Sequence, residues 1–387
     1  MLIASKDKPL ATTITGSLPR PSWFTQNLQG RPIANALSDL LFREQYIDAL
    51  ATYVSDQVRA GIDILTDGDA RFDMDVGGRS WFSYMSERIR GTGPAQMMPQ
   101  PWTSPREQTA GDILHEVNET RLPSKVVGPI SRGDLQYPIV WKVAQRMTNR
   151  HVKLGTCCGQ LLEAVLINEH YKDRPALIDS MNKAMNEEYH ALADAGCPAI
   201  QLEEPLIHYV ASAPPGGMDA AFYVKAFNAE VAGLRKKTEV WVHTCWGNPA
   251  AQKVEVDTSY EPALPFLNQL DVDVITFETA SDGGAAYELI GRHVSKEKKV
   301  CIGVVNHRTL QVETPEQVAA LIRKALKHIE PQRLILGTDC GFGRQGMSRM
   351  HAFFKMVSIV KGTNIVRKEL GIPEAECLAG DAKFKLL

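Results

Sequence analysis

The sequence lacks long apolar runs, an excess of charge of either sign and a recognisable secretion signal. It contains no stretch of about 18 uncharged apolar residues, which argues against a membrane span. Lys and Arg number 43 and Asp and Glu number 45, so the formal charge of −2 gives no general attraction to nucleic acid or anionic membranes. The opening segment MLIASKDKPLATT lacks the apolar core of a signal peptide, so we expect a cytoplasmic protein.

Cysteine is also sparse, with seven residues in a chain of 387. An odd number without a secretory signal argues against a disulfide framework. The cysteines can therefore be buried filler, a redox site or metal ligands. Apolar residues make up 44% of the chain and charged residues 23%, which is typical of a globular protein with a large buried core.

Short apolar runs recur along the chain and alternate with segments of helical apolar spacing. Near-continuous apolar runs are typical of parallel strands that are buried on both faces. Eight runs fit this description: 12–16, 62–66, 152–156, 199–202, 240–243, 272–277, 300–305 and 334–337. The clearest helical segments are 37–60, 176–195, 220–236, 315–329 and 347–370. Eight repeats of strand and helix predict an α/β fold, a single (β/α)8 barrel of the TIM type.

One region interrupts this alternation. Residues from about 70 to 150 are rich in Gly, Pro and Met, and separate the second predicted strand from the third. We interpret them as an insertion with an extra strand at 125–130 that partly covers the barrel mouth. The chain 1–387 is then one catalytic domain.

Polar residues follow seven of the eight predicted strands. In such barrels the active residues lie at the C-terminal ends of the strands or in the loops just after them. The strand-end groups are Gly16-Ser17, Asp67-Gly68-Asp69, Glu203-Glu204-Pro205, His243-Thr244-Cys245, Glu278-Thr279, Asn306-His307 and Asp339-Cys340.

Four of these residues have the chemistry of a metal site. His243 and Cys245 are two apart on one strand, so both side chains face the same side. Glu278 ends the sixth strand and Cys340 the eighth. One imidazole, two thiolates and one carboxylate suit Zn²⁺ better than Mg²⁺ or Ca²⁺. Each residue alone is more often filler or a loop acid, and only their joint occurrence predicts zinc.

These ligands also indicate a type of reaction. A free thiol has a pKa of about 8.5, so little of it is ionised at neutral pH, whereas a coordinated thiol is deprotonated. Two cysteine thiolates make the metal a weak Lewis acid and keep a substrate sulfur nucleophilic. We therefore expect thiol activation for alkyl transfer, with Glu278 as the ligand that yields to the incoming thiolate.

The HxC…E…C set, together with TTITGSLPRP, IQLEEP and TDCG, resembles cobalamin-independent methionine synthase. The resemblance covers nearly the whole chain but only the catalytic C-terminal barrel of the long enzymes, so this chain is similar to the short, single-barrel branch. It implies a zinc-dependent methyltransferase of methionine biosynthesis, in which a homocysteine thiolate attacks the methyl group of methyltetrahydrofolate.

The resemblance also implies roles for individual residues. Ser17 lies in the turn whose backbone amides hold the amino-acid carboxylate, although an extra threonine interrupts the motif. Asp69 and Glu203 match acids that bind the amino group, and Glu204 is a further candidate for substrate binding. Alternatively, such acids hold arginines in place. His307 matches a histidine near the methyl-transfer site and could protonate the departing group.

The donor side departs from the family pattern. Tyr209 stands where the family has a glutamate for the pterin, Leu166 where it has a tryptophan, and Leu122-Pro123 gives no counterpart of an Arg-Cys pair. Arg132 survives from the family's V-G-x-x-S-R motif. Arg132, Tyr209 and Trp246 are therefore the candidates for a donor site. The donor could be a methylated pterin, a methylcobamide on a partner protein, or another methylated compound.

Other functions remain open at this point. Epoxyalkane–coenzyme M transferases resemble the same barrel and metal motif, but a sulfonate-bearing thiol would need Arg or Lys where Asp69 and Glu203 stand. A non-catalytic zinc or corrinoid carrier would not need a lined chamber, and a decarboxylase of the uroporphyrinogen type would not need zinc. The helix faces of such barrels often pair, which leaves a homodimer open.

Overall fold

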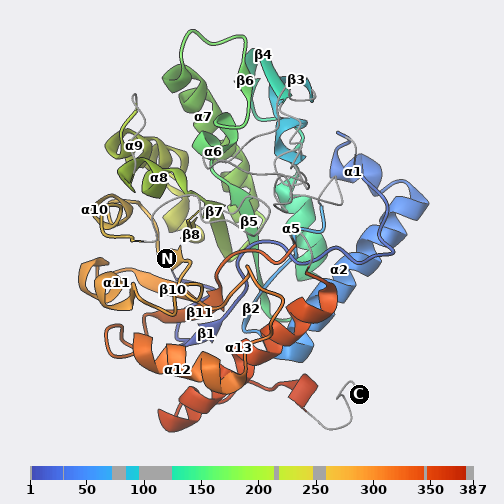
Figure 1. Ribbon diagram of the computed structural model, residues 1–387. Coiled ribbons are helices and arrows are strands. Elements are labelled where there is room, and N and C mark those ends of the chain that lie inside the picture. The colour runs from blue at the N-terminus through green and yellow to red at the C-terminus, as the bar shows by residue number, and fades with distance from the viewer. Residues whose placement is uncertain are drawn as a thin grey trace, which may run out of the picture.

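The computed structural model describes residues 2–28, 30–71, 84–95, 124–212, 218–246, 259–343 and 347–380. Within these ranges, eight parallel strands form one sheet in the order β1-β11-β10-β9-β8-β7-β5-β2. A single parallel bridge between Thr13 and Ile64 joins the two outer strands and closes the sheet. The strands lie in the middle of Figure 1 with helices around them, so the predicted (β/α)8 barrel is confirmed.

All eight predicted barrel strands are present, with ends that differ by a few residues. They are β1 (Ala11–Thr12), β2 (Ile64–Thr66), β5 (His151–Cys157), β7 (Ala199–Glu203), β8 (Glu239–Thr244), β9 (Val274–Phe277), β10 (Lys299–Val305) and β11 (Leu334–Thr338). The largest difference is at β1, which ends at Thr12, because beyond that residue the chain has only the bridge at Thr13.

The predicted helices are also present. The long ones are α2 (Leu40–Ala60), α7 (Arg174–Asp194), α9 (Ala220–Glu230), α12 (Pro315–Ala325) and α13 (Arg349–Glu369). Shorter ones are α1 (Ile33–Ala36), α5 (Tyr137–Gln145), α6 (Gly159–Glu163), α8 (Leu206–Ser212), α10 (Leu264–Leu267), α11 (Tyr287–His293), and the 3-10 turns η1 (Leu234–Lys236) and η3 (Leu378–Gly380). In the described ranges, none of the helices is both long and apolar enough to span a bilayer.

Side-chain caps explain where the long helices begin. Each N-cap oxygen accepts a hydrogen bond from a backbone amide in the first turn, which otherwise has no partner inside the helix. The five caps are Asp39, Asp173, Asp219, Thr314 and Ser348.

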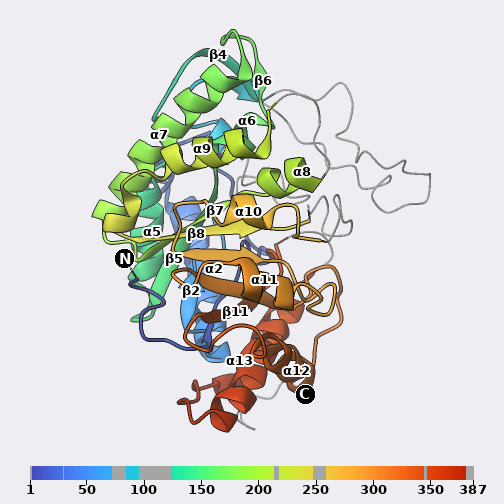
Figure 2. The same ribbon diagram turned by 90° about the vertical axis from the view of Figure 1, so that its left-hand side faces the viewer.

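The predicted insertion contains a second, three-stranded sheet. It consists of β3 (Arg90–Ala95), β4 (Ser124–Ser131) and β6 (Ile167–Asn168), with β3 antiparallel and β6 parallel to β4. The strand expected at 125–130 is therefore confirmed as β4. Figures 1 and 2 both show β4 and β6 beyond the barrel, near one end of α7. Residues 72–83 and 96–123 lie outside the described residues, so the insertion as a cover for the barrel mouth stays a prediction.

A layer of apolar side chains fills the inside of the barrel near the N-terminal ends of the strands. Its members are buried and form a cluster of their own: Ala4, Ala11, Ile64, Ala199, Trp241, Val274, Cys301 and Ile335. The larger apolar core lies between strands and helices. The polar residues named from the sequence lie toward the other end, where the strands finish.

The seam between β1 and β2 depends on one carboxylate more than on backbone pairing. Asp63 Oδ2 accepts hydrogen bonds from the backbone amide of Thr12 at 2.8 Å and from its hydroxyl at 2.9 Å. The same oxygen pairs with Arg367 of α13 at 2.6 Å, and Arg367 is nearly buried. Thr13 adds a hydrogen bond from its hydroxyl to the carbonyl of Ile64 at 2.8 Å. The seam is therefore closed mainly by side chains.

Replacing Asp63 should weaken the barrel measurably. We expect Asp63→Ala to lower the free energy of unfolding by about 3 kcal/mol, because it removes two hydrogen bonds and leaves the buried Arg367 without its carboxylate. Asp271→Ala is the control, since Asp271 forms an exposed ion pair with Arg235 and should cost less than about 1 kcal/mol. Urea unfolding of both variants gives the comparison. Equal losses would show that the seam does not depend on Asp63.

Candidate metal centre and its surroundings

The lateral register of three neighbouring strands brings polar side chains to one level of the barrel. Glu203 at the end of β7 lies opposite His243 of β8, and His243 lies opposite Thr276 of β9. Alternate residues of a strand face the same side, so Cys245 follows His243 on the inner face. His243 and Thr276 are 1% exposed, and Cys245 is 6% exposed.

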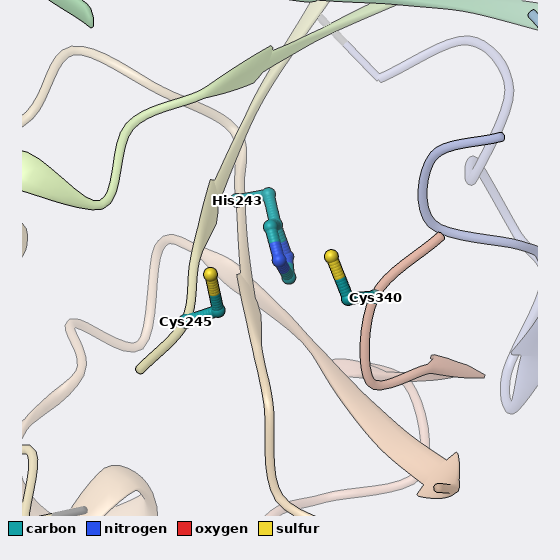
Figure 3. Close-up of side chains that lie close together, drawn as sticks. All are labelled: His243, Cys245 and Cys340. Atoms are coloured by element: carbon teal, nitrogen blue, oxygen red, sulfur yellow. The ribbon is translucent and has the colours of Figure 1, made fainter. Parts of the chain in front are cut away.

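Three of the four predicted metal ligands meet at this level. His243, Cys245 and Cys340 each offer one atom, and these atoms all lie within 4.8 Å of one another. Figure 3 shows the imidazole of His243 between the two cysteines, with Cys340 entering from the loop that follows β11. Cys245 and Cys340 are both free thiols, so neither sulfur is tied up in a disulfide.

The surroundings of His243 leave one ring nitrogen for a ligand. Its Nδ1 is 2.8 Å from the hydroxyl of Thr276, which fixes the plane of the ring. Its Nε2 is buried and has no hydrogen-bond partner among the described residues; Glu203 Oε2, at 3.7 Å, is too distant for one. An imidazole with a free nitrogen beside two thiols fits Zn²⁺, which takes three protein ligands in many catalytic sites.

The two cysteines differ in acidity. A hydrogen bond from Cys245 is the main reason that the pKa of Cys340 lies well below the usual range, and His243 contributes in the same direction. The same pairing, together with burial, raises the pKa of Cys245. Burial alone would lower the pKa of His243, but the charges of Glu203 and Cys340 raise it to about 9. These contacts thus favour a thiolate at Cys340 next to a cationic imidazole at His243.

Glu278 lies outside the group of three. Arg308 binds both of its oxygens, with Nε at 2.8 Å from Oε1 and Nη2 at 3.1 Å from Oε2. The hydroxyl of Ser281 and the backbone amide of Trp246 donate to the same carboxylate at 3.1 and 3.2 Å. Glu278 would have to loosen these contacts to reach a metal, and its role as the fourth ligand stays a prediction.

A second cluster consists of Glu278, His307 and Asp339. His307 follows β10, is 3% exposed, and has no hydrogen-bond partner for either ring nitrogen among the described residues. Burial is the main reason that its pKa is lowered to about 4. A neutral imidazole at neutral pH offers one donor and one acceptor, which suits contact with a substrate group or water.

Asp339 organises the loop that carries Glu278. Its oxygens accept hydrogen bonds from the backbone amides of Thr279, Ala280 and Ser281 at 2.7–2.8 Å. Gly303 of β10 allows this approach, since a Cβ there would lie 1.8 Å from Asp339 Oδ1. The carboxylate of Asp339 is therefore already bound by backbone amides, and burial raises its pKa to about 7.

Asp69 is paired with an arginine. Arg71 Nη1 lies 2.9 Å from Asp69 Oδ1 and 3.1 Å from Asp67 Oδ2, and its Nη2 donates to the carbonyl of Gly155 at 2.6 Å. Burial raises the pKa of Asp69 to about 7, although the charge of Arg71 opposes the rise. This pairing is the alternative considered from the sequence, an acid that holds an arginine, and a role in amino binding stays a prediction.

Ser17 lies where the loops after β1 and β11 meet. Its carbonyl accepts hydrogen bonds from the backbone amides of Phe342 and Gly343 at 2.7 and 2.9 Å. Gly16 has a φ of +71°, and a Cβ there would lie 2.9 Å from the Cα of Gly341. The turn of TTITGSLPRP is thus held beside the loop that carries Cys340.

Glu203 and Glu204 point to opposite sides of β7. Glu203 faces inward toward His243 and is 17% exposed. Glu204 is fully buried, and its two oxygens accept hydrogen bonds from Gln160 Nε2 at 2.7 Å and from the backbone amide of Ile207 at 3.0 Å. Burial raises the pKa of Glu204 to about 7. Glu203 is the better candidate for a substrate contact, while the role of Glu204 stays a prediction.

The three donor-site candidates have different surroundings. Arg132 follows β4, is 40% exposed and pairs with Glu188 at 2.6 Å. Tyr209 lies on α8 and packs partly against the core. Trp246 is 1% exposed beside the metal group, and its indole nitrogen has no hydrogen-bond partner among the described residues. Of the three, Trp246 is the residue next to the candidate ligands; Leu122-Pro123 lies outside the described residues.

The sequence analysis missed residues that support the site rather than form it. Thr276 hydrogen-bonds to His243, and Arg308 hydrogen-bonds to Glu278. Thr276 could have been found, because it is two residues before Glu278 and therefore faces the same side of β9. Arg308 gave no comparable signal, since its contact with Glu278 depends on how two loops fold.

Comparison with known proteins identifies related chains. The family described as "Cobalamin-independent synthase, Catalytic domain" matches residues 106–361. A methionine synthase from Saccharolobus islandicus is 30% identical over 369 residues, which are 95% of this chain and 97% of the relative.

Two solved structures are also similar to this chain. A B12-independent methionine synthase from Shewanella sp. W3-18-1, solved in complex with selenomethionine, superposes with a TM-score of 0.73 and 26% identity, covering 94% of this chain and 99% of that one. A putative vitamin-B12 independent methionine synthase from Listeria monocytogenes has a TM-score of 0.64 at 16% identity, with 91% and 96% coverage, and supports the fold alone.

Removing either sulfur should remove the metal. We expect Cys245→Ser and Cys340→Ser to lose stoichiometric zinc, because a hydroxyl is a poor zinc ligand, while both variants remain folded. Cys197→Ser is the matched control: Cys197 is buried outside the candidate ligand group and donates to the carbonyl of Ala199, so zinc should stay. Elemental analysis and circular dichroism measure the two properties. Full zinc content in either ligand variant would contradict the assignment.

Proposed function

The chain belongs to the cobalamin-independent methionine synthase family through its catalytic domain, and on this basis we propose that it methylates the thiol of homocysteine. A methyltransferase activity follows from the family. Methionine would then be the product, and the selenomethionine bound by the Shewanella relative is consistent with a pocket for that amino acid. The observation that carries the proposal is the group of His243, Cys245 and Cys340 at the ends of strands, in which His243 and Cys245 are buried and Cys340 is partly buried.

The acceptor thiol is proposed to be activated at this group. His243, Cys245 and Cys340 would hold Zn²⁺, which when bound lowers the pKa of a coordinated thiol so that it is a thiolate at neutral pH. Thr276 keeps the imidazole of His243 oriented through the hydrogen bond to Nδ1. Glu278 would be the fourth residue to hold the metal, and Arg308 would hold its carboxylate whenever it is away from the metal.

The amino-acid end of homocysteine is proposed to lie between the loops after β1, β2 and β7. Glu203 offers an inward carboxylate for the ammonium group, and Oε2 is on the side of His243. Asp69 can contribute its second oxygen, since Arg71 binds only Oδ1. The turn at Ser17 offers backbone amides for the carboxylate. The two carboxylates of Glu203 and Asp69 favour an amino acid over a sulfonate-bearing thiol, which is why we prefer methyl transfer to the opening of epoxides.

His307 is proposed to assist the departing group. It is buried near the metal group, and both ring nitrogens are without partners in the described part of the chain. Its N–H can donate to the atom that loses the methyl group, whose negative charge grows as the bond breaks. Trp246, which is buried and follows Cys245 in the chain, would exclude water from the thiolate.

The donor is proposed to differ from methyltetrahydrofolate. Tyr209, Leu166 and Leu122-Pro123 replace the residues that serve the folate in the family pattern, whereas the four metal positions are retained. A methylcobamide on a partner protein or another methylated compound would need no pterin pocket.

Homocysteine should bind to the zinc-loaded protein with release of a proton. We expect about one proton per site at pH 7.5, because the free thiol is mostly protonated at that pH and the bound one is ionised. Titration calorimetry in buffers of different ionisation enthalpy measures the proton count. Coenzyme M is the control, and the sulfonate should bind more weakly. Homocysteine binding without proton release would contradict thiolate activation.

The choice of donor can be tested directly. We expect methylcobalamin to support methionine formation at a rate at least about tenfold higher than methyltetrahydrofolate. Three folate-binding positions of the family differ in this chain, and the loss of one polar contact lowers affinity for the folate by about that factor. Methionine is quantified by mass spectrometry with zinc-loaded protein, and Cys245→Ser gives the background. A higher rate with methyltetrahydrofolate would show that the changed residues do not exclude the folate.

A further inference from the structure

A line of buried polar side chains runs inside the barrel below the metal group. Lys153 of β5 is 1% exposed, and its ammonium donates to Gln201 Oε1 of β7 at 2.6 Å. Gln201 is also 1% exposed and donates through Nε2 to Glu203 Oε1 at 2.9 Å. Glu203 Oε2 then faces His243 Nε2 at 3.7 Å. The line connects a buried cation to the candidate ligand of the substrate's ammonium group.

Lys153 is expensive to bury and has few partners. Its ammonium lies 4.5 Å from the ring centroid of Trp241, a favourable contact for a cation, and it donates to Gln201. Burial lowers the pKa of Lys153 to about 8, so the side chain still carries its charge at neutral pH. A fold that only needed volume at this position could use Met or Leu, which cost nothing to desolvate.

The chemistry of the three groups fixes the direction of the Gln201 amide. An ammonium group can only donate hydrogen bonds, so it must face the amide oxygen of Gln201. The amide nitrogen then points to Glu203, whose carboxylate can only accept. Glu203 Oε1 is occupied in this way, and Oε2 remains on the side of His243. If Lys153 did not donate, Gln201 could turn its oxygen toward Glu203 and repel it.

We propose that Lys153 and Gln201 are positioning residues that hold Glu203 in the orientation that recognises an amino group on the thiol substrate. The inference rests on the proposed function, because it takes Glu203 as the ligand of the homocysteine ammonium group. Lys153 acts through Gln201 and touches neither the substrate nor the metal ligands. Its loss should therefore affect selection of the substrate and leave zinc content unchanged.

The test compares two thiols that differ only in the amino group. Homocysteine and 4-mercaptobutanoate share the thiol and the carboxylate, so the ratio of their dissociation constants reports recognition of the amine. The ratio is measured by calorimetry on zinc-loaded wild type, Lys153→Met, Gln201→Met and the double variant. Lys153→Met removes the charge at similar length, and the double variant removes both partners together, so that neither is left buried and unpaired.

Lys299→Met is the matched control. Lys299 of β10 is a second largely buried lysine of the barrel, but its ammonium donates to the carbonyl of Ser5 near the opposite end. Zinc content and thermal unfolding are recorded for every variant, so that a loss of folding is separated from a loss of selectivity.

The wild type should prefer homocysteine by about tenfold or more, the value expected for one charge-assisted contact. Lys153→Met and Gln201→Met should each lose most of this preference through weaker homocysteine binding, with little change for 4-mercaptobutanoate. The double variant should be no less selective than Gln201→Met alone, because the two residues act in series. Lys299→Met should keep the wild-type ratio.

The other outcomes overturn the inference at different levels. A wild-type ratio retained in Lys153→Met, additive losses in the double variant, or an equal loss in Lys299→Met would each show that Lys153 does not position Glu203. Equal binding of the two thiols by the wild type would remove Glu203 as the amino ligand while homocysteine remained an acceptor. No homocysteine binding at all would instead contradict the proposed function.

Discussion

The site depends on how neighbouring parallel strands are aligned. Because Glu203, His243 and Thr276 occupy the same level of β7, β8 and β9, one imidazole has an acid on one side and a hydroxyl on the other. The hydroxyl orients the ring, and the free nitrogen faces the thiols. A shift of one residue in any of these pairings would turn the inner side chains outward, so the ladder that holds the barrel together also determines the chemistry at its rim.

Charge neutralisation explains much of what surrounds the candidate ligands. Buried carboxylates are costly unless each has a partner, and arginines pair with two groups of these acids. Arg71 pairs with Asp67 and Asp69, and Arg308 pairs with Glu278. Glu203 has no arginine among the described residues; it accepts from Gln201 and faces His243, which leaves capacity for a cationic substrate.

The sequence was sufficient for the barrel and for the three residues that meet. Apolar runs are visible without a structure, and spacing by two places His243 and Cys245 on one face. The same rule separates Glu203 from Glu204, since adjacent residues face opposite sides, and applying it would have directed Glu204 to the helices. The pairing of Glu278 with Arg308 could not be predicted, because loop conformations decide it. The single-domain assignment and the roles of most site residues remain predictions.

The weakly paired seam between β1 and β2 divides the C-terminal end of the barrel into two parts. From β7 to β11 the strands are linked by continuous ladders, and this part carries His243, Cys245 and Cys340. The strands that lead to Ser17 and Asp69 flank the seam, where one bridge and a few side-chain hydrogen bonds connect them. Amide hydrogens along the seam should therefore exchange with solvent sooner than those of the ladders. The strands that carry the metal ligands would then be more rigid than the loops after β1 and β2. An amino acid could enter and leave beside these loops without disturbing the metal.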